Sequence, residues 1–533
     1  MNEDFRAAAT PPHSLWLALL AVLLSAVVMR GLLLASNAVS FHADEAVVGL
    51  MAQHILEGER PVFFYGQAYM GSLDAWLIAG GFAVLGESVL TIRIIQSALY
   101  LGVVAASFLC AWLFTRRVTA SFVTGLLFAI PPTLVALYTT ATLGGYNETM
   151  LCGTLIIILA YTLMQKDFRS WWRWTALGFC AGLGWWTNGL IVIYAVPAVG
   201  LLLFGWARAF RQRREWLIFG GAIAAIAAFL IGSAPWWIYA LQNDLAPLRF
   251  YLGGSQGLGA DIVTLPFGER LIGLFFLGLP ALFGLRFPWS AQIFLPFVGI
   301  IITILFVIAV IASFRQHTLS KTARGLLFGM IGWFTLVYLG TRFSSDPTGR
   351  YFLPLTLPLF IFFGAWIAGI SRRWLQVGLT AIAVGYFGLG QIAAISTPPG
   401  FTTQFNLTQH IPNDHDAELI AFLEENDLTR GYAPYWISFR LAFLSGDELQ
   451  YSAALPDKPN SEYRPMDERY PPYRAAADAA TRFAIITAEQ LGLDERVLSE
   501  LEIAGVIFQT QTLGSYRVYY NFEPQSTAPR PPF

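Results

Sequence analysis

The chain has 533 residues, of which 56% are hydrophobic, 15% are aromatic and only 13% are charged. Because soluble domains carry roughly 25% charged residues, this composition excludes an ordinary soluble protein and predicts a chain that crosses a membrane many times. The 33 basic and 34 acidic residues give a net charge of -1, so nothing indicates a nucleic-acid partner.

The apolar runs of the chain predict about eleven transmembrane helices. Basic residues mark the cytoplasmic side of a membrane protein. They cluster here at 116–117, 166–173, 208–214, 315–324 and 372–373. The resulting alternation places the N-terminus in the cytoplasm and the C-terminus outside. The expected spans are 15–34, 89–114, 120–137, 150–164, a pair within 174–206, 216–239, 293–314, 326–339, 352–370 and 375–394.

Two apolar runs do not fit this alternation. The runs 73–85 and 271–285 each lie between an external loop and an internal basic cluster. One other span already crosses the membrane there, so a second crossing would put the basic cluster outside. Both runs are also short for a membrane span, so we predict interfacial or re-entrant helices there.

The composition changes at Ser396-Thr397-Pro398-Pro399-Gly400. Residues 1–395 therefore form the predicted membrane domain, and residues 396–533 a small soluble α/β domain. The latter shows a helical pattern at 417–425 and strand patterns at 483–487, 506–512 and 516–521. The predicted fold class is an all-α polytopic membrane domain with a small C-terminal α/β extracytoplasmic domain, in a multi-pass protein of the plasma membrane. The tail has no cysteine, so we expect it to lean on the membrane part or on the bilayer surface.

Two adjacent carboxylates follow the first span, in Phe41-His42-Ala43-Asp44-Glu45. Charges are costly at the edge of a membrane, which favours a functional role for them. The alternative is that Asp44 caps the next helix and Glu45 favours its dipole. That helix is amphipathic, with Val47 and Leu50 on its apolar face, and is expected to rest in the interface.

Further polar residues gather in the predicted external loops. They include Tyr146-Asn147-Glu148, Asn188, Arg249, Asp261, Arg342, Asp346 and Arg350. A transporter would hold such groups near the bilayer midplane. Their concentration at one interface instead suits an enzyme whose substrate is a lipid with a polar head.

Several short motifs resemble the GT-C class of membrane glycosyltransferases, in particular the protein O-mannosyltransferases and the lipid A aminoarabinose transferase. The resemblance rests on four stretches between the N-terminus and about residue 394. They are His42 to Glu45, Gly86-Glu87-Ser88 with Arg93, Gly182 to Leu190, and Gly349 to Pro358.

The resemblance implies roles for the acidic residues. Asp44 would act as the general base with Glu45 beside it, and Glu148 would be the second-loop acid. Two departures put donor or acceptor identity in question. The basic Lys-Pro-Pro run of many relatives is replaced by 65–72, and their third-loop Lys-Gly is Asn188-Gly189.

The resemblance implies a polyprenyl-phosphate sugar as the donor. No nucleotide-binding glycine loop or DxD-type run is evident, which favours a lipid-linked donor over a sugar nucleotide. The donor phosphate gains charge on leaving, and guanidinium groups stabilise such charge; the candidates are Arg350, Arg342 and Arg249. A carboxylate such as Asp44 takes the proton of the attacking hydroxyl, and direct displacement inverts the anomeric centre. Candidate substrate-binding residues are His42, Tyr65, Gln67, Tyr69, Tyr146, Asn147, Asn188 and Tyr351.

Each assignment has an alternative. Arg350 and Arg342 would, in the alternative, extend to lipid headgroups instead of binding a substrate. The aromatic residues would then anchor the chain in the aromatic belt of the membrane. The three cysteines lie in apolar segments without CxxC spacing. We expect no required metal, although His42, Asp44 and Glu45 could hold a divalent ion between them.

The predicted function is thus transfer of a sugar from a polyprenyl-phosphate donor to an acceptor hydroxyl of a protein, lipid or glycan outside the membrane. A transporter or flippase of lipid-linked sugars is the main alternative. A non-catalytic scaffold that tolerates change at Asp44 is another.

Overall fold

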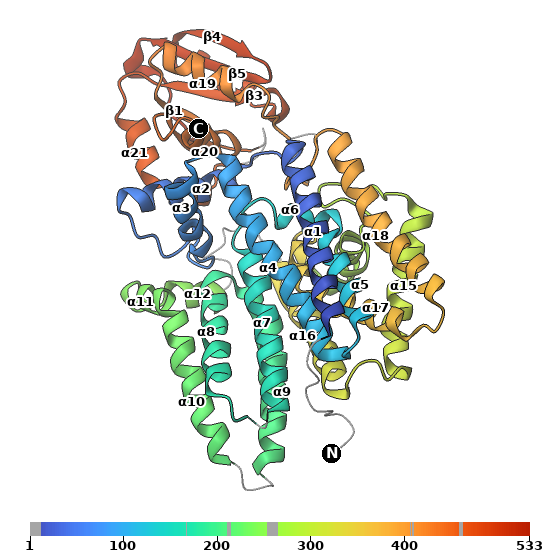
Figure 1. The fold of residues 1–533 in the computed structure, drawn as a ribbon. Helices are drawn as coiled ribbons and strands as arrows, with labels where there is room; N and C mark the ends of the chain where they lie inside the picture. The colour runs from blue at the N-terminus through green and yellow to red at the C-terminus, as the bar shows by residue number, and fades with distance from the viewer. Residues whose placement is uncertain are drawn as a thin grey trace.

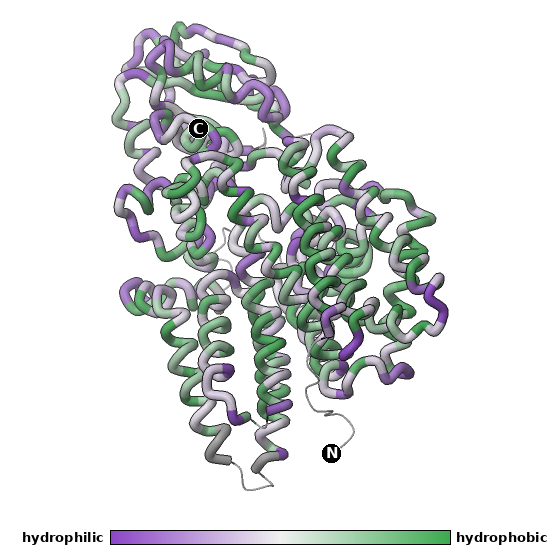
Figure 2. The backbone as a smooth tube through the Cα atoms, viewed as in Figure 1, coloured by the Kyte–Doolittle hydropathy of each residue, from purple (hydrophilic) through white to green (hydrophobic). Residues whose placement is uncertain are grey.

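The computed structural model describes residues 12–166, 168–210, 215–252, 265–405, 407, 410–457 and 462–533. It is mainly helical, and one sheet near the C-terminus lies at an end of the helical part (Figure 1). Figure 2 shows that hydrophobic residues dominate the long helices, whereas the sheet domain has more hydrophilic positions.

The helical part extends to the end of α18. Its α-helices are α1 (His13–Ala35), α2 (Ala43–Glu57), α3 (Leu73–Leu85), α4 (Val89–Thr115), α5 (Val118–Ala129), α6 (Thr133–Tyr138), α7 (Tyr146–Gln165), α8 (Trp171–Thr187), α9 (Val192–Phe210), α10 (Glu215–Gly232), α11 (Ala234–Gln242), α12 (Ala246–Leu252), α13 (Phe267–Ile272), α14 (Leu279–Leu282), α15 (Pro296–Arg315), α16 (Lys321–Gly340), α17 (Thr356–Gly369) and α18 (Arg373–Ser396). Shorter helical segments include η1 (Gly189–Ile191), a π-helical η3 (Gly273–Gly278), η4 (Arg342–Ser345) and η5 (Arg350–Leu355).

The chain is a multi-pass membrane protein. Among the described residues, eight helices are long and apolar enough to cross a membrane: α1, α4, α7, α9 with η1, α15, α16, η5 with α17, and α18. The α10 and α11 pair, bent by 64°, adds a ninth if it is one span.

The sequence predicts about eleven spans, two more than this count. One of the two is α8, which has only 17 residues. The other is broken, because Pro131-Pro132 follows the 12-residue α5 and separates it from α6. Proline cannot donate the backbone hydrogen bond that would continue the helix.

The two runs that the sequence excludes as spans are short helices. The first is the 13-residue α3, about 20 Å long and therefore shorter than the hydrocarbon core. The second is divided among α13, η3 and α14.

The C-terminal domain contains one five-stranded sheet in the order β2-β1-β3-β5-β4. β1 (Arg430–Pro434) pairs in parallel with β2 (Gln450–Leu455) and β3 (Ala484–Ala488), and β5 (Tyr516–Glu523) is antiparallel to β3 and to β4 (Ile507–Leu513). The helices of the domain are α19 (Asp416–Glu425), α20 (Tyr435–Leu444), α21 (Pro471–Ala479) and α22 (Asp494–Ile503). The predicted helix and three strands correspond to α19, β3, β4 and β5. β1 and β2 show no strand pattern in the sequence, because they are short and β1 contains Gly431 and Pro434.

Helix α2 is where the two parts of the chain meet. It packs against α3 on one side and α20 on the other, and nearly all of its residues from Ala43 to Ile55 are buried. The helix therefore lacks the exposed polar face that an amphipathic helix would have, because Gln53 and His54 are buried as well. The apolar residues of α2, α3 and α20 instead form one hydrophobic cluster, so the C-terminal domain is joined to the helical part by a shared core.

Candidate active site

A cavity of about 460 Å³ lies between the helical part and the C-terminal domain. The helical part contributes seven of the residues that the sequence singles out: Asp44, Gln67, Tyr69, Tyr146, Asn188, Arg350 and Tyr351. The C-terminal domain contributes Tyr435, Trp436, Asp457, Arg464, Asp467 and Arg469.

Asp44 occupies the first turn of α2, where the helix dipole favours a negative charge. It does not cap the helix, because the N-cap residue is His42. The phenol of Tyr435 donates a hydrogen bond to Asp44 Oδ1. Burial, together with the adjacent Asp44, raises the pKa of Tyr435, so the phenol stays protonated and remains a donor.

Arg469 contacts Gln67 on the same side of the cavity. With the amide oxygen of Gln67 turned toward the guanidinium, Oε1 accepts from Nη1 at 2.6 Å and from Nη2 at 2.8 Å. The amide nitrogen then donates to the hydroxyl of Tyr69 at 3.1 Å. The guanidinium also lies over the ring of Tyr435, 5.2 Å from its centroid. Asp44, Tyr435, Arg469, Gln67 and Tyr69 thus form one connected set.

Arg350 begins η5, directly after Gly349, whose φ of 86° lies in the left-handed region that glycine adopts readily. Its Nε is 2.7 Å from Asp346 Oδ2, and its Nη2 donates to the hydroxyl of Tyr351 at 3.3 Å. The side chain keeps 34% of its surface exposed, so it remains accessible from the cavity.

Aromatic rings line much of the remaining wall. Tyr69 stacks on Phe250 with centroids 4.2 Å apart, and burial raises the pKa of its hydroxyl. Tyr146 packs edge-on against Tyr138 at 5.4 Å. Flat rings of this kind suit the apolar faces of a sugar. Asn188 also lines the cavity. Its Oδ1 accepts from Leu190 N and its Nδ2 donates to Gly144 O, so its amide holds the start of η1 in place.

Glu45 does not line the cavity, although it is adjacent to Asp44 in sequence. Successive helical residues point in different directions, and Glu45 is completely buried. Arg93 Nε donates to Oε1 at 3.1 Å and Nη2 to Oε2 at 3.0 Å. The expected catalytic neighbour is therefore half of a buried ion pair between α2 and α4.

Glu148 and Asn147 also lie outside the lining of the cavity. Glu148 is buried and accepts from Gln96 Nε2 at 3.2 Å. Asn147 donates to Gln96 Oε1 at 2.7 Å and to Thr139 O at 3.0 Å. Both therefore tie α7 to its neighbours.

Three other candidates are not brought to the cavity, and a fourth is not described there. His42 is buried, which lowers its pKa, and its Nε2 accepts from Thr403 N at 3.3 Å. Tyr65 donates to Glu59 at 2.6 Å in a separate network, and Arg249 is exposed on α12. The side chain of Arg342 lies outside the described residues. In the described part of the chain, no three His, Cys, Asp or Glu side chains are placed to hold a metal together.

The part of the cavity wall that comes from the C-terminal domain was not identified from the sequence. Tyr435 lies 391 positions after Asp44, and Arg469 is in a loop without regular structure. The only signal was the aromatic run Gly431 to Trp436, whose role the sequence leaves open.

Comparisons with known proteins find chains of similar sequence and similar fold. Residues 72–237 match the family model described as dolichyl-phosphate-mannose-protein mannosyltransferase. Two relatives are named undecaprenyl phosphate-alpha-4-amino-4-deoxy-L-arabinose arabinosyl transferase. The one from Pseudomonas aeruginosa is 28% identical over 39% of this chain and 38% of its own length. The one from Pseudomonas fluorescens is 25% identical over 59% of this chain and 53% of its own length. The chain therefore matches about half or less of these relatives.

Crystal structures of ArnT from Cupriavidus metallidurans share the fold over nearly the whole chain. The structure bound to undecaprenyl phosphate has a TM-score of 0.59 at 12% identity and covers 96% of this chain and 98% of that one. The apo structure has a TM-score of 0.62 at 13% identity, with coverage of 96% and 99%. The chain thus has the fold of the GT-C class of membrane glycosyltransferases, which confirms the resemblance predicted from its sequence. Within that class, the similarity is to the ArnT and protein mannosyltransferase type.

Proposed function

We propose that this protein is a glycosyltransferase that moves a sugar from a polyprenyl-phosphate donor to an acceptor hydroxyl. The observation that supports it most directly is a cavity that holds the carboxylate of Asp44 and the guanidinium of Arg350 within a GT-C fold. The relatives named for undecaprenyl phosphate-linked sugar transfer agree with this donor class.

The chemistry assigns one task to each group. The bond between the anomeric carbon and the donor phosphate oxygen breaks while the acceptor oxygen bonds to that carbon from the opposite face. Asp44 accepts the proton of the acceptor hydroxyl, and Tyr435 holds the carboxylate in place. The phosphate leaves as a monoester with an added negative charge, which Arg350 stabilises. This single displacement inverts the anomeric centre.

We further propose that the cavity and the C-terminal domain are extracytoplasmic. Arg117 donates to Ala368 O at the end of α17, and Ser320 N donates to Phe114 O. These contacts gather the basic clusters near 116–117, 315–324 and 372–373 at one end of the helical part. The ends of α1 and α18 meet at the other, where Ser40 N donates to Phe401 O beside the C-terminal domain. The basic end is expected to be cytoplasmic.

Release of free polyprenyl phosphate tests the proposal. Purified full-length protein is incubated with a panel of polyprenyl-phosphate sugars and native membranes as the source of protein, lipid or glycan acceptors. We expect wild type to release the carrier and Asp44→Asn to reduce release by about a hundredfold or more, because the general base is lost. Asp427→Asn, a change of the same kind at an exposed residue of the C-terminal domain, is the control and should leave release unchanged.

Two results would contradict the proposal. Full release by Asp44→Asn would exclude Asp44 as the base. No carrier release by wild type, combined with movement of lipid-linked sugar across reconstituted vesicles, would favour the flippase alternative.

A further inference from the structure

The C-terminal domain places one guanidinium deep in the cavity. Arg469 lies between the short helix η7 (Pro465–Asp467) and α21, and only 7% of its surface is exposed. Gly66 allows this close approach, because a Cβ there would lie 3.2 Å from both Cα and Cδ of Arg469. The segment around Arg469 is thus seated directly on the loop that contains Gln67.

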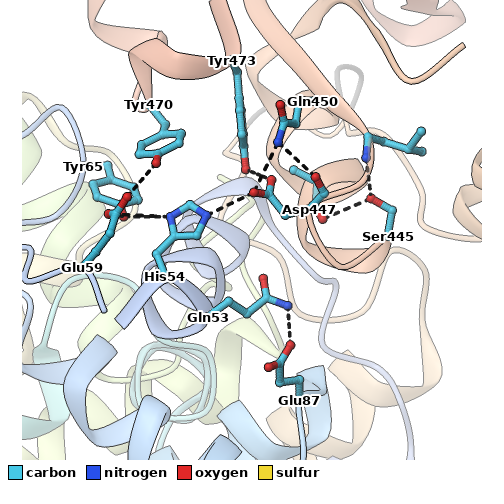
Figure 3. A network of polar contacts seen from close by, with 12 residues as sticks. Gln53, His54, Glu59, Tyr65, Glu87, Ser445, Asp447, Gln450, Tyr470 and Tyr473 are labelled. Atoms are coloured by element: carbon cyan, nitrogen blue, oxygen red, sulfur yellow. Dashed lines mark hydrogen bonds and ion pairs between the residues drawn. The ribbon is translucent and has the colours of Figure 1, made fainter. Parts of the chain in front are cut away.

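A separate polar network holds this segment in place (Figure 3). The hydroxyls of Tyr65 and Tyr470 donate to the two oxygens of Glu59 at 2.6 Å and 2.8 Å. The rings of Tyr65 and Tyr470 lie 4.8 Å apart. Residue 470 is therefore anchored on one side while Arg469 faces the cavity, so the guanidinium is fixed before any ligand binds.

Within the described part of the chain, the direct contacts of Arg469 are with neutral groups. They are the amide of Gln67, the ring of Phe64 and the phenol of Tyr435. Arg350, in contrast, is already paired with Asp346. Two acids act on Arg469 from nearby, Asp44 and Asp467, and their charges favour the cationic form of the guanidinium.

Among the described residues no carboxylate contacts this buried guanidinium, so a phosphate in the cavity would be its first ion-pair partner. We propose that Arg469 binds the phosphate group of the polyprenyl-phosphate substrate, which makes the C-terminal domain part of the substrate site. This inference rests on the proposed function. Arg350 from η5 and Arg469 from the C-terminal domain then face a phosphate whose charge increases during the reaction, and the exposed Arg464 lines the same cavity.

The test compares binding of polyprenyl phosphate and of the uncharged polyprenol to purified full-length protein in nanodiscs. Wild type should prefer the phosphate. We expect Arg469→Gln to weaken binding of polyprenyl phosphate by about tenfold to a hundredfold. Binding of the polyprenol should not change, and Arg469→Lys should lose less affinity because it keeps the charge.

Arg474→Gln is the matched control, because Arg474 lies on the neighbouring α21 and pairs with Asp478 outside the cavity. It should bind both lipids as wild type does. Thermal unfolding of each variant shows whether it is folded. If Arg469→Gln does not fold, binding of polyprenyl phosphate by Arg469→Lys tests the role of Arg469 instead.

The outcomes separate the two proposals. Normal affinity of Arg469→Gln and Arg469→Lys for polyprenyl phosphate, in a protein whose wild type prefers the phosphate, would overturn the role of Arg469 alone. If wild type binds polyprenyl phosphate and polyprenol equally, the proposed donor class fails, and with it the inference.

Discussion

At the scale of single residues, Asp44 and Glu45 show how neighbours in sequence take different environments. Both were expected at the site, yet two successive positions of one helix direct Asp44 to the cavity and Glu45 to Arg93. The sequence could locate the acidic pair but not separate its members, because their difference depends on which helix packs against each face of α2. The residue that holds Asp44, Tyr435, was beyond any local pattern.

Tyr435→Phe tests this positioning role. Loss of the hydrogen bond to Asp44 should lower kcat about tenfold to a hundredfold, because a hydrogen bond to a charged group contributes about 1.5–3 kcal/mol. KM and the affinity for polyprenyl phosphate should stay near wild type, since the ring remains beneath Arg469. Steady-state kinetics of carrier release measure both values. Tyr520→Phe, in the sheet and outside the cavity, is the control; an unchanged kcat in Tyr435→Phe would contradict the assignment.

At the scale of elements, His54 on α2 links the first loop to the C-terminal domain (Figure 3). Its Nδ1 is 2.9 Å from the hydroxyl of Tyr65, and its Nε2 is 3.3 Å from Asp447 Oδ2. Because Tyr65 gives its proton to Glu59 and Asp447 can only accept, both ring nitrogens must donate. The geometry therefore favours the imidazolium form.

The surrounding groups agree with that form. Burial alone lowers the pKa of His54, but the hydrogen bond and charge of Asp447, with Glu59 and Glu57, more than offset it, so the pKa is raised. Tyr65, Tyr470 and Tyr473 complete the surroundings as neutral phenols. A raised folded-state pKa stabilises the protein fully below the ordinary value of about 6.5, and this contribution is lost as pH rises through the folded-state pKa.

We therefore expect the thermal stability of wild type to fall more steeply than that of His54→Gln as the pH rises above about 6.5. Unfolding temperatures measured across this range in one detergent and at constant ionic strength test the expectation. Parallel curves for the two proteins would show that His54 does not titrate at the domain contact.

At the scale of the whole molecule, the sequence predicted local features well and long-range contacts poorly. The bounds of α3, the three strands β3 to β5 and the change of composition near residue 396 follow from local patterns. The seating of the C-terminal domain on α2 does not, because it joins residues nearly 400 positions apart. Arg469 in the cavity wall was missed for the same reason, whereas Arg350 was among the candidates.

The contact between the two parts depends on close packing at Gly49 of α2. A Cβ at this position would lie 2.5 Å from Cε2 of Phe443 on α20, closer than atoms can approach. The Phe443 ring has little room to move, because the ring centroids of Phe41 and Phe82 lie 5.4 Å and 6.2 Å from its own centroid. One added methyl group should therefore disturb the packing of α2 against α20. This contact, called the seam below, positions both Tyr435 and Arg469.

Gly49→Ala should lower the free energy of unfolding by about 1–3 kcal/mol, the usual cost of overpacking a core. Carrier release should fall with it, because the two walls of the cavity come from the two sides of this seam. Gly80→Ala is the matched control: Gly80 lies in the adjacent α3 with nothing within 4 Å of its added Cβ. Since alanine favours a helix over glycine, that variant should be as stable as wild type or more so. Thermal unfolding and carrier release on both variants measure the effect, and equal behaviour of the two would show that the seam does not govern activity.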